Sequence, residues 1–372
     1  MKIKAAPLLL CAFIASWWGL FLLPEIATPT PLVDDSVLLM PKPVIAHDHL
    51  STIHKKDLLD ALTGDVNKME TLIRDWDVDA QVLQALGAKE IKRLPPEALP
   101  RLHTLMQRVH KEEGTPKLYY PQTFLAAGIL LALAPHTHIT ALPAGFRVQR
   151  HIYPEELTAK IPLDVNHILT EAATPPGSTI AFISPLSHPP TLHALKRRGI
   201  QLIDLGNVTE IDHLAQSIAL CGKWTGREER AELLNLFVQA AVMALENRLQ
   251  IHRLDDVAYL EYRTTLTVPT TRTLAGNLID RLKLSTPFKS SSDYGFTTPV
   301  EFEELQRVRP KTLIIAVSHS KQKEELLARP VIANLIKNGS KAYFVQRGTY
   351  ETASQFFLLG YFDLCSILAA RA

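Results

Sequence analysis

The sequence of 372 residues has few cysteines and lacks the common catalytic signatures. Its three cysteines, Cys11, Cys221 and Cys365, form no CxxC or Cys/His spacing of the kind that holds zinc. No G-x-S-x-G, H-E-x-x-H or G-x-x-x-x-G-K-[ST] segment occurs. These absences exclude the usual zinc sites and argue weakly against an enzyme. Whether Cys221 and Cys365 pair in an oxidising compartment stays open.

The sequence also has little net charge. The formal net charge is +2, and the longest basic run is Lys196–Arg198. So small an excess gives no basic surface for nucleic acid. Apolar residues make up 47% of the chain, which is enough to bury the core of one large domain or of two.

The N-terminus has the pattern of an export signal. Lys2 and Lys4 precede an uncharged run over residues 5–23. We expect a signal peptide within residues 1–27. An uncleaved membrane anchor is the alternative, because Glu25 spoils the cleavage pattern and the run is nearly as long as the roughly 20 residues that span a bilayer. In both cases the body is expected in the periplasm, either soluble or anchored by residues 5–23.

A long helix is expected over residues 227–251. The stretch Glu228–Gln250 contains no Gly or Pro, and its apolar residues recur at steps of three and four. Charged residues gather at both ends, among them Glu246 and Arg248, and we expect them to be solvated. Such a helix, flanked on both sides by alternating strands and helices, is typical of a connector between two lobes.

The rest of the chain predicts an α/β fold: two Rossmann-like β/α lobes joined by the connector helix, with an N-terminal helical extension. The expected domains are a signal peptide or anchor (1–27), a linker (28–46), the extension (47–116), an N-terminal lobe (117–226), the connector (227–251) and a C-terminal lobe (252–372). Helices are expected in the extension near 55–62, 66–75, 79–87 and 97–112. Expected strands are 117–120, 138–145, 178–185, 200–206, 256–263, 311–320 and 341–346, and 287–298 is expected to be a loop.

Ligands of parallel sheets bind beyond the carboxyl ends of the strands. The residues at these ends are rich in hydroxyl, imidazole and aromatic groups and poor in carboxylates, which suits holding a ligand more than acid–base turnover. The predicted ligand-binding residues are Tyr119, Gln122, Thr123, Ser187, His188, Tyr262, Arg263, Ser318, His319, Arg347 and Tyr350. The same strand ends also carry Tyr120, Pro121, Ser184 and Ser320.

Each candidate also has a structural interpretation. Tyr119 suits a plain strand residue, and Ser187 with His188 suits a turn. His319 suits the cap of the following helix, and Arg263 suits an ion pair with Glu261. The pair His136 and His138 could attract a metal, but a polar loop is favoured, because no carboxylate or cysteine follows at close range.

At the level of local sequence, the chain resembles the class III periplasmic binding proteins of ABC importers. The segment 195–234 is similar to the family's helix, Gly-Ile, short strand, helix and Gly-containing turn into the connector. The segment HIYPEEL (151–157) resembles the first-lobe Tyr-Pro-acid loop, and 259–282 with 313–320 follows the order of the second lobe. The extension departs from the family pattern, as does the missing acidic residue after Thr123.

The resemblance implies a binding protein without catalytic activity or intrinsic cofactor. Its ligand would be an iron chelate, haem or a cobalamin-like molecule, delivered by an expected monomer to an inner-membrane ABC permease. Tyr350 or His319 would then be an axial contact to haem, with no metal site assigned. Acids such as Glu155, Glu156, Glu301, Glu303 and Glu304 would dock on the permease. The alternatives are a membrane-anchored scaffold whose extension binds a partner, and an enzyme on a similar scaffold.

Overall fold

The computed structural model describes residues 50–88, 90–166, 168–170, 173–249, 256–282, 284, 288 and 295–369. All of them lie within residues 33–372, one of the two units into which the chain divides. The side chains of Tyr350 and Glu351 lie outside the described part, as do the signal or anchor and the linker expected from the sequence.

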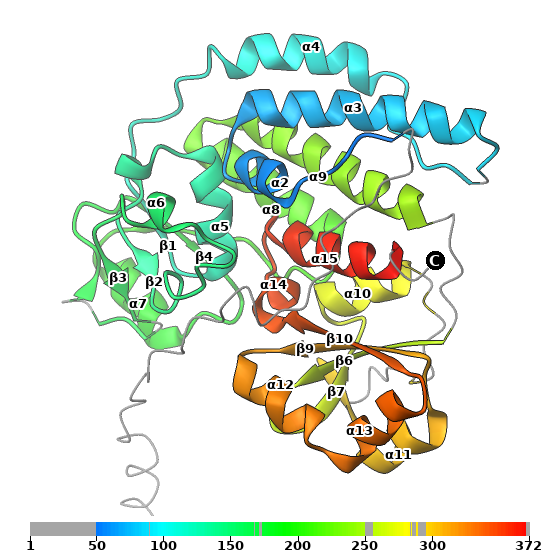
Figure 1. Cartoon of the computed structure of the whole chain (residues 1–372). Coiled ribbons are helices and arrows are strands. Elements are labelled where there is room, and N and C mark those ends of the chain that lie inside the picture. Colours follow the sequence, from blue (N-terminus) through cyan, green and yellow to red (C-terminus); the bar gives the residue numbers. More distant parts are fainter. Residues whose placement is uncertain are drawn as a thin grey trace, which may run out of the picture. The chain divides into compact units, whose positions relative to one another are not determined.

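The first lobe is built on a three-stranded parallel sheet in the order β1-β4-β5. Its strands are β1 (Tyr119–Pro121), β4 (Ile180–Ile183) and β5 (Gln201–Asp204), and a short parallel pair, β2 (Leu142–Pro143) with β3 (Asp164–Val165), lies beside it (Figure 1). The helices of this lobe are α5 (Phe124–Leu133), α6 (Glu155–Thr158), α7 (Pro189–Arg197) and α8 (Ile211–Thr225), with a 3-10 turn η2 (His136–His138). Of the extended segment expected at 138–145, Leu142–Pro143 form β2 and Ile139 makes an isolated bridge to Tyr119, whereas Ala144 and Gly145 form a turn.

The connector predicted from the sequence is helix α9 (Glu228–Leu249). It follows α8 across Gly226, whose φ of 64° lies in the left-handed region that glycine adopts without strain. The Glu112 carboxylate accepts hydrogen bonds from the backbone N–H groups of Glu229 (2.8 Å) and Arg230 (3.2 Å). These donors have no partner within the helix, so the carboxylate caps its start.

The second lobe is built on a five-stranded sheet in the order β10-β9-β6-β7-β8. β6 (Val257–Tyr262), β9 (Thr312–Val317) and β10 (Lys341–Gln346) run parallel, whereas β7 (Leu266–Pro269) and β8 (Thr297–Val300) are antiparallel. This lobe therefore has two antiparallel strands beside the parallel strands that the alternation of strands and helices predicted. The helices are α10 (Leu274–Arg281), α11 (Phe302–Val308), α12 (Ser320–Leu327), α13 (Pro330–Lys337), α14 (Arg347–Glu351) and α15 (Phe357–Ala369).

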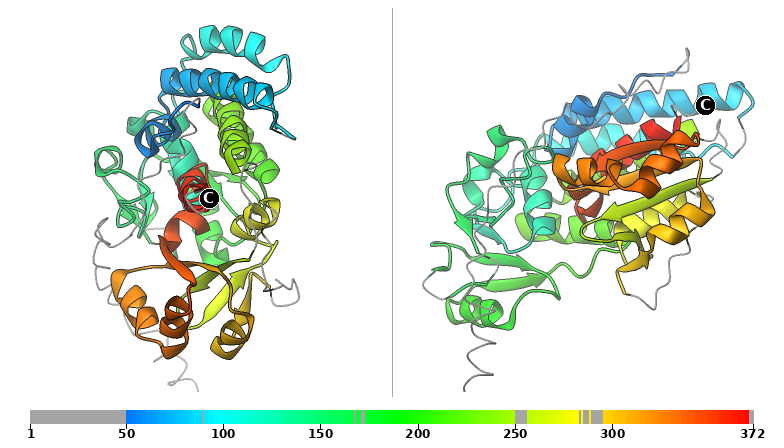
Figure 2. Two further views of the ribbon diagram at one scale, coloured as in Figure 1. Left: turned by 45° about the vertical axis from the view of Figure 1, so that its right-hand side comes forward. Right: turned by 60° about the horizontal axis from the view of Figure 1, so that its bottom comes forward.

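The N-terminal extension packs along the connector. Its helices are α2 (Lys55–Leu62), α3 (Val66–Ala85) and α4 (Ala98–Val109), and both α3 and α4 contact α9 (Figure 1). Figure 2 shows α3 and α4 beside α9 from two further directions. The two helices expected at 66–75 and 79–87 form the single helix α3. Helix α15 contacts both α9 and β10, which joins the connector to the second lobe.

The core is continuous from the extension into both lobes. One cluster of buried side chains includes Trp76 of α3, Phe182 of β4, Phe237 of α9 and Phe362 of α15. Cys221 and Cys365 are buried free thiols. Among the described residues, no helix has the length and apolarity needed to cross a bilayer.

Candidate ligand-binding site

A cavity of about 310 Å³ lies at the carboxyl edge of the first-lobe sheet. Gln122 and Thr123 follow β1, Ser184 follows β4, and Gly206 comes two residues after β5. Parallel strands end at one edge, so residues far apart in sequence meet there. The cavity is lined by Gln122, Thr123, Phe124, Leu125, Pro143, Ala144, Ser184, Leu186, Gly206, Asn207, Val208 and Ala353.

The polar side chains at this edge are held by hydrogen bonds. Gln122 is buried, and the Ser187 hydroxyl donates to its Oε1 atom. Ser187 Oγ in turn accepts from the backbone N–H of Ser184 at 3.1 Å. Thr123 caps α5, because its Oγ1 atom accepts from the backbone N–H of Ala126 at 3.2 Å. Ser187 therefore supports the cavity wall through Gln122 instead of lining the cavity itself.

The β5 side of the cavity depends on a tight turn. Gly206 has a φ of 73°, and its backbone N–H donates to the Asp204 carboxylate at 2.9 Å. An Asp side chain that accepts from the backbone two residues later is a common turn device. The turn places Asn207 and Val208 in the cavity wall while the Asp204 carboxylate is engaged with the backbone.

The carboxyl edge of the second-lobe sheet gathers another group of predicted residues. β6, β9 and β10 are parallel neighbours, so Arg263, Ser318 and Arg347 follow strands that end together. The Gln322 side chain accepts from the Ser318 backbone N–H (2.8 Å) and donates to the Arg263 carbonyl (3.0 Å). Gln346 donates to the Ser318 carbonyl at 3.2 Å.

Several of the residues predicted to bind a ligand lie in the core or at the start of a helix instead. Tyr119 is 1% exposed and its hydroxyl meets that of Thr115 at 2.7 Å, so it does not line the cavity. Tyr262 is buried in the core of the second lobe. His319 caps α12, its Nδ1 accepting from the Gln322 backbone N–H at 3.3 Å. His188 occupies the N-cap position of α7 without capping it through its side chain.

Residues 347–351 form a short helix directly after β10. Arg347 begins α14, and the Thr349 hydroxyl donates to the Gln346 carbonyl at 2.6 Å. The side chain of Tyr350 lies outside the described part, so its predicted contact to haem stays a prediction.

Some lining residues were not anticipated. The strand-end rule, applied to the expected strand 200–206, would have found Gly206 and Asn207. No local signal marks Ala353, because it joins the cavity from a segment between α14 and α15. Gln322 and Gln346, which join the strand ends of the second lobe, also lack a sequence signature.

The tyrosines around the first-lobe sheet are neutral phenols. Burial raises the pKa values of Tyr119 and Tyr120, and it raises the pKa of Tyr153 to about 12. Burial also lowers the pKa of His136, with Lys160 adding to the effect. Across the described ranges, no group of three or more His, Cys, Asp or Glu side chains is placed to hold a metal ion.

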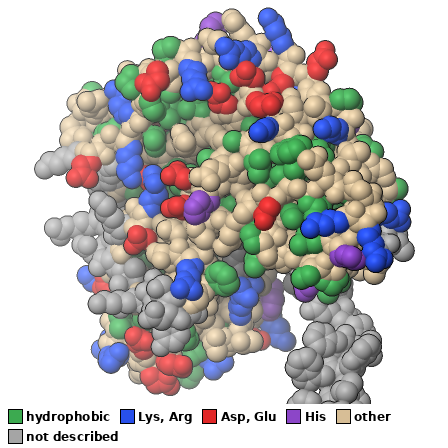
Figure 3. All heavy atoms as spheres, turned by 180° about the vertical axis from the view of Figure 1, so that it is seen from behind, with side chains coloured by type: hydrophobic (Ala, Val, Ile, Leu, Met, Phe, Trp, Pro, Cys, Tyr) green, Lys and Arg blue, Asp and Glu red, His purple; other side chains and the backbone are tan. Residues whose placement is uncertain are grey.

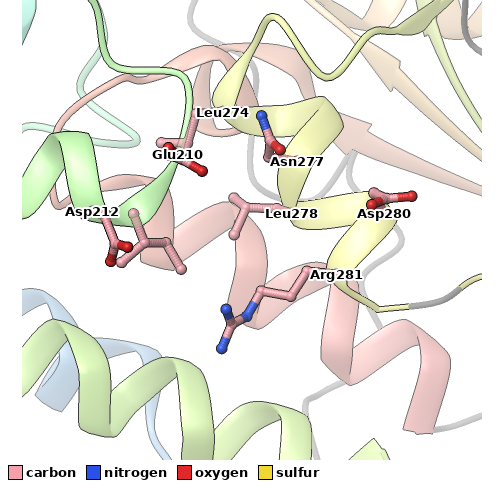
Figure 4. Close-up of a pocket in the computed structure, with 8 residues that line it drawn as sticks. Glu210, Asp212, Leu274, Asn277, Leu278, Asp280 and Arg281 are labelled. Carbon is pink, nitrogen blue, oxygen red and sulfur yellow. The ribbon is translucent and has the colours of Figure 1, made fainter.

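A smaller cavity of about 200 Å³ lies between α8 and α10. Figure 4 shows Glu210 and Asp212 at the start of α8 facing residues of α10 that include Asn277 and Arg281. The Arg281 guanidinium is already paired with the carboxylate of Glu246. Asn277 donates to the backbone carbonyls of Thr209 (2.6 Å) and Thr271 (2.5 Å). Asn277 thus links α10 to the segment before α8, and Arg281 links it to α9.

The arrangement of lobes and connector has counterparts among solved structures. The periplasmic haem-binding protein RhuT from Roseiflexus sp. RS-1 superposes with a TM-score of 0.54 at 16% identity, over 69% of this chain and 99% of that one. A possible iron-binding periplasmic protein from Staphylococcus epidermidis gives 0.54 at 17% identity, over 67% and 97%. A periplasmic haem-binding protein from Pseudomonas aeruginosa gives 0.54 at 16%, over 69% and 92%.

No family model and no curated protein matches the sequence. The structural likeness establishes the fold: the chain has the two-lobed α/β fold of periplasmic binding proteins, which confirms the fold implied by the resemblance to class III. The matched structures are described as binding proteins, and their matches leave about a third of this chain without a counterpart.

Proposed function

We propose that the protein is an exported binding protein that holds a small molecule at the carboxyl edge of its first lobe and delivers it to an inner-membrane ABC permease. The cavity of about 310 Å³ at this edge carries the proposal. Ligand pockets of about 300–1,000 Å³ are usual, so the cavity has room for part of a large ligand. An iron chelate, haem or a cobalamin-like molecule is the ligand class that we propose.

The chemistry of the cavity supports binding without turnover. Among the described residues that line it, none carries an imidazole, thiol, carboxylate or amine. General acid–base catalysis needs such a group within hydrogen-bond reach of the substrate. The enzyme alternative therefore receives no support from this site.

The scaffold alternative is also less well supported. The apolar face of α4, with Leu102, Leu105 and Met106, is buried in the core that it shares with α9. In the described part of the extension, the exposed large hydrophobic residues are Val78 and Leu86. The extension thus presents little apolar surface to a partner, because most of it covers the connector.

The test is a titration of the whole chain in lipid nanodiscs, with empty nanodiscs as the blank. Haemin, cyanocobalamin and ferric hydroxamate and catecholate chelates are titrated by calorimetry and by visible absorbance. Tryptophan fluorescence is a poor probe, since Trp76 is buried against Phe237 with ring centroids 5.5 Å apart. Saturable binding of one compound supports the proposed ligand class, and a lack of heat and of spectral change with all of them contradicts it.

A matched pair of variants locates the binding site. Ala144 is exposed and lines the cavity, so Ala144→Trp fills the cavity without disturbing the core. Ala328 is an equally exposed alanine at the end of α12 in the second lobe. We expect Ala144→Trp to abolish measurable binding and Ala328→Trp to leave it unchanged. Equal affinities in the two variants would place the ligand elsewhere.

A further inference from the structure

The composition of the first-lobe cavity indicates which part of a ligand it accepts. Most of the lining is apolar: Phe124, Leu125, Pro143, Ala144, Leu186, Val208 and Ala353. The polar contributors are two hydroxyls and two amides, from Thr123, Ser184, Gln122 and Asn207. None of the described lining residues carries a formal charge.

Two charged side chains that neighbour the lining in sequence, Asp204 and Arg147, are already engaged. The Asp204 carboxylate accepts from the Gly206 backbone N–H. Arg147 pairs with Asp164 at 2.6 Å and also donates to the backbone carbonyls of Thr158 and Ile161. A carboxylate or ammonium group entering the cavity would therefore lose its water without gaining a counter-ion from the lining. Such burial of an unpaired charge is strongly unfavourable.

The two hydroxyls can each donate to a ligand. Thr123 Oγ1 accepts from the Ala126 N–H, and Ser184 Oγ accepts from the Leu186 N–H at 3.3 Å. A backbone N–H can only donate, so these bonds use oxygen lone pairs and leave both hydroxyl protons for another acceptor. A carbonyl or ether oxygen of the ligand would be such an acceptor.

An aromatic row ends at the cavity wall. Phe124 meets Phe146 edge to face at 5.3 Å, and Phe146 stacks on Tyr153 at 3.7 Å. Tyr153 in turn meets Phe356 at 5.0 Å. Phe124 is the only member of this row that lines the cavity. A flat ring in the cavity would extend the row through a further aromatic contact.

We propose that this cavity binds an uncharged, flat apolar group that bears a carbonyl or ether acceptor, and that it rejects the anionic or cationic equivalent. The inference rests on the proposed function, because it specifies which part of the ligand the first lobe holds. Acidic or iron-coordinating parts of the ligand are then held outside this cavity.

The test uses two probes of nearly equal shape, 2-naphthamide and 2-naphthoate, with the whole chain in nanodiscs at pH 7.5. Binding is followed by saturation-transfer NMR and by competition. We expect the amide to bind at least about tenfold more tightly than the carboxylate. Ala144→Trp should abolish amide binding, and Ala328→Trp should retain it. Naphthoate binding as tightly as naphthamide, or the absence of binding of both, would overturn the proposal.

A second pair of variants tests the hydroxyl donor. Thr123→Val removes both the donor and the helix cap, whereas Thr123→Ser keeps both. We expect Thr123→Val to weaken amide binding about two- to tenfold, the range of one hydrogen bond, and Thr123→Ser to weaken it less than twofold. An equal loss in both variants would exclude the hydroxyl as the donor.

The two proposals fail in different ways. If the amide binds selectively but haemin, cyanocobalamin and the ferric chelates do not, the cavity chemistry stands and the proposed ligand class is wrong. If one of these large ligands binds while the amide shows no preference over the carboxylate, the proposed function stands and the inference about the cavity is overturned.

Discussion

The extension and the C-terminal end of α9 meet at a contact with buried charges, here called the joint, which consists of Asp79, Lys92, Glu246 and Arg248. The joint differs in this respect from the ligand cavity. At the C-terminal end of α9, Arg248 is 3% exposed and pairs with Asp79 of α3 at 2.7 Å. Glu246 is 4% exposed and meets Lys92, Arg281 and the Tyr361 hydroxyl. The described part of the cavity lining, by contrast, has no charged side chain.

Buried charge at the joint fixes which groups must meet. Arg248 also donates to the Ser51 carbonyl at 2.5 Å, and the backbone N–H and hydroxyl of Ser51 donate to Asp79. Burial lowers the pKa of Arg248, and the charge and hydrogen bond of Asp79 oppose that effect. A buried ion pair adds little net stability but penalises any arrangement that separates it. The joint is therefore specific in geometry, while the cavity is selective for neutral groups.

The face of the molecule shown in Figure 3 resembles neither the joint, with its buried ion pairs, nor the cavity, with its uncharged described lining. On the face shown in Figure 3, Lys and Arg side chains are interspersed with Asp and Glu. Mixed charge of this kind agrees with the small net charge of the sequence. The two specialised regions thus lie against a background of ordinary solvated charge.

The largest effect is expected from breaking the joint. Asp79→Ala leaves the Arg248 guanidinium buried without its carboxylate, which should lower the free energy of unfolding by about 3–5 kcal/mol. Urea unfolding followed by circular dichroism measures the loss. Ligand affinity of the folded fraction should stay unchanged, since neither residue lines the cavity.

The double variant Asp79→Ala with Arg248→Met is the control. Removing both charges should recover much of the stability, because no unpaired charge remains. If the double variant is as unstable as Asp79→Ala alone, the cost comes from lost packing and the charge argument is wrong.

A smaller effect is expected at the uncharged contact between α5 and the segment before α15. A Cβ atom added to Gly128 would lie 2.6 Å from Ser354 Oγ and 2.8 Å from its Cβ. Gly128→Ala should therefore cost about 1–3 kcal/mol by overpacking, and it should also weaken ligand binding because Ala353 lines the cavity. Thermal unfolding and the naphthamide titration measure the two effects.

Ser354→Gly removes both of the clashing atoms. Combined with Gly128→Ala, it should restore most of the lost stability and affinity. A double variant that stays as weak as Gly128→Ala would show that the effect does not arise from this contact. The two regions can then be compared. A change at the uncharged contact of Gly128 with Ser354 should alter ligand affinity, whereas a change at the charged joint should not.

Periodic sequence patterns predicted several of the elements well. The helix expected from Glu228 is α9, and the expected helix 55–62 and strand 341–346 have the bounds of α2 and β10. These segments carry their own signals: apolar spacing, a lack of Gly and Pro, and a turn before the strand. The comparison with solved structures confirms the resulting two-lobed fold.

The errors arose where distant residues decide the structure. α3 was expected to break near Asp79, but this carboxylate faces Arg248, 169 residues away in sequence, so the helix continues. The charged end of α9 was expected to be solvated, and this was wrong for the same reason: Glu246 and Arg248 are buried against partners from other helices. The spacing of residues within one helix does not reveal an ion pair with a residue of another helix.

The strands β7 and β8 were missed for a related reason. Each has only four residues and contains a proline, which weakens the strand signal; β8 overlaps the expected loop 287–298, and no element was predicted over β7. They form by pairing with one another and with β6. The candidate site likewise combines residues with and without a local signal. Gln122 and Thr123 were predicted because they follow a strand, whereas the place of Ala353 depends on how the segment before the last helix returns to the first lobe.

A smaller, pH-dependent effect is expected at His136. Its pKa is lowered, chiefly by burial and then by Lys160, so the unfolded chain binds a proton more readily than the folded protein. The stabilising contribution is therefore present above the ordinary pKa of about 6.5 and is lost as pH falls through the folded pKa. Between pH 7.5 and 5.5 the wild type should lose more unfolding free energy than His136→Gln.

His138→Gln in the same 3-10 turn is the matched control for loss of a histidine. Urea titrations at several pH values provide the measurement. Parallel stability–pH curves for the wild type and His136→Gln would contradict the prediction.

The smallest effect is expected from a thiol reagent, with which Cys221 and Cys365 of the native protein should hardly react. Cys221 and Cys365 are fully buried, and burial raises both pKa values, with the Glu246 charge adding to the effect at Cys365. A buried, protonated thiol is a poor nucleophile. In a Cys11→Ser background, the native protein should therefore release almost no chromophore from a disulfide reagent such as DTNB, and about two equivalents per chain after denaturation in urea.

Dithiothreitol should leave the unfolding midpoint unchanged, because the two thiols are free.

Reaction of Cys365 in the native protein at neutral pH would mean that the surroundings of Glu246 open to solvent, and the charged joint would then be less rigid than its ion pairs suggest. Reaction of Cys221 alone would place the opening in α8, away from Glu246. Peptide mapping of the labelled cysteine thus distinguishes motion at the charged joint from motion in the first lobe.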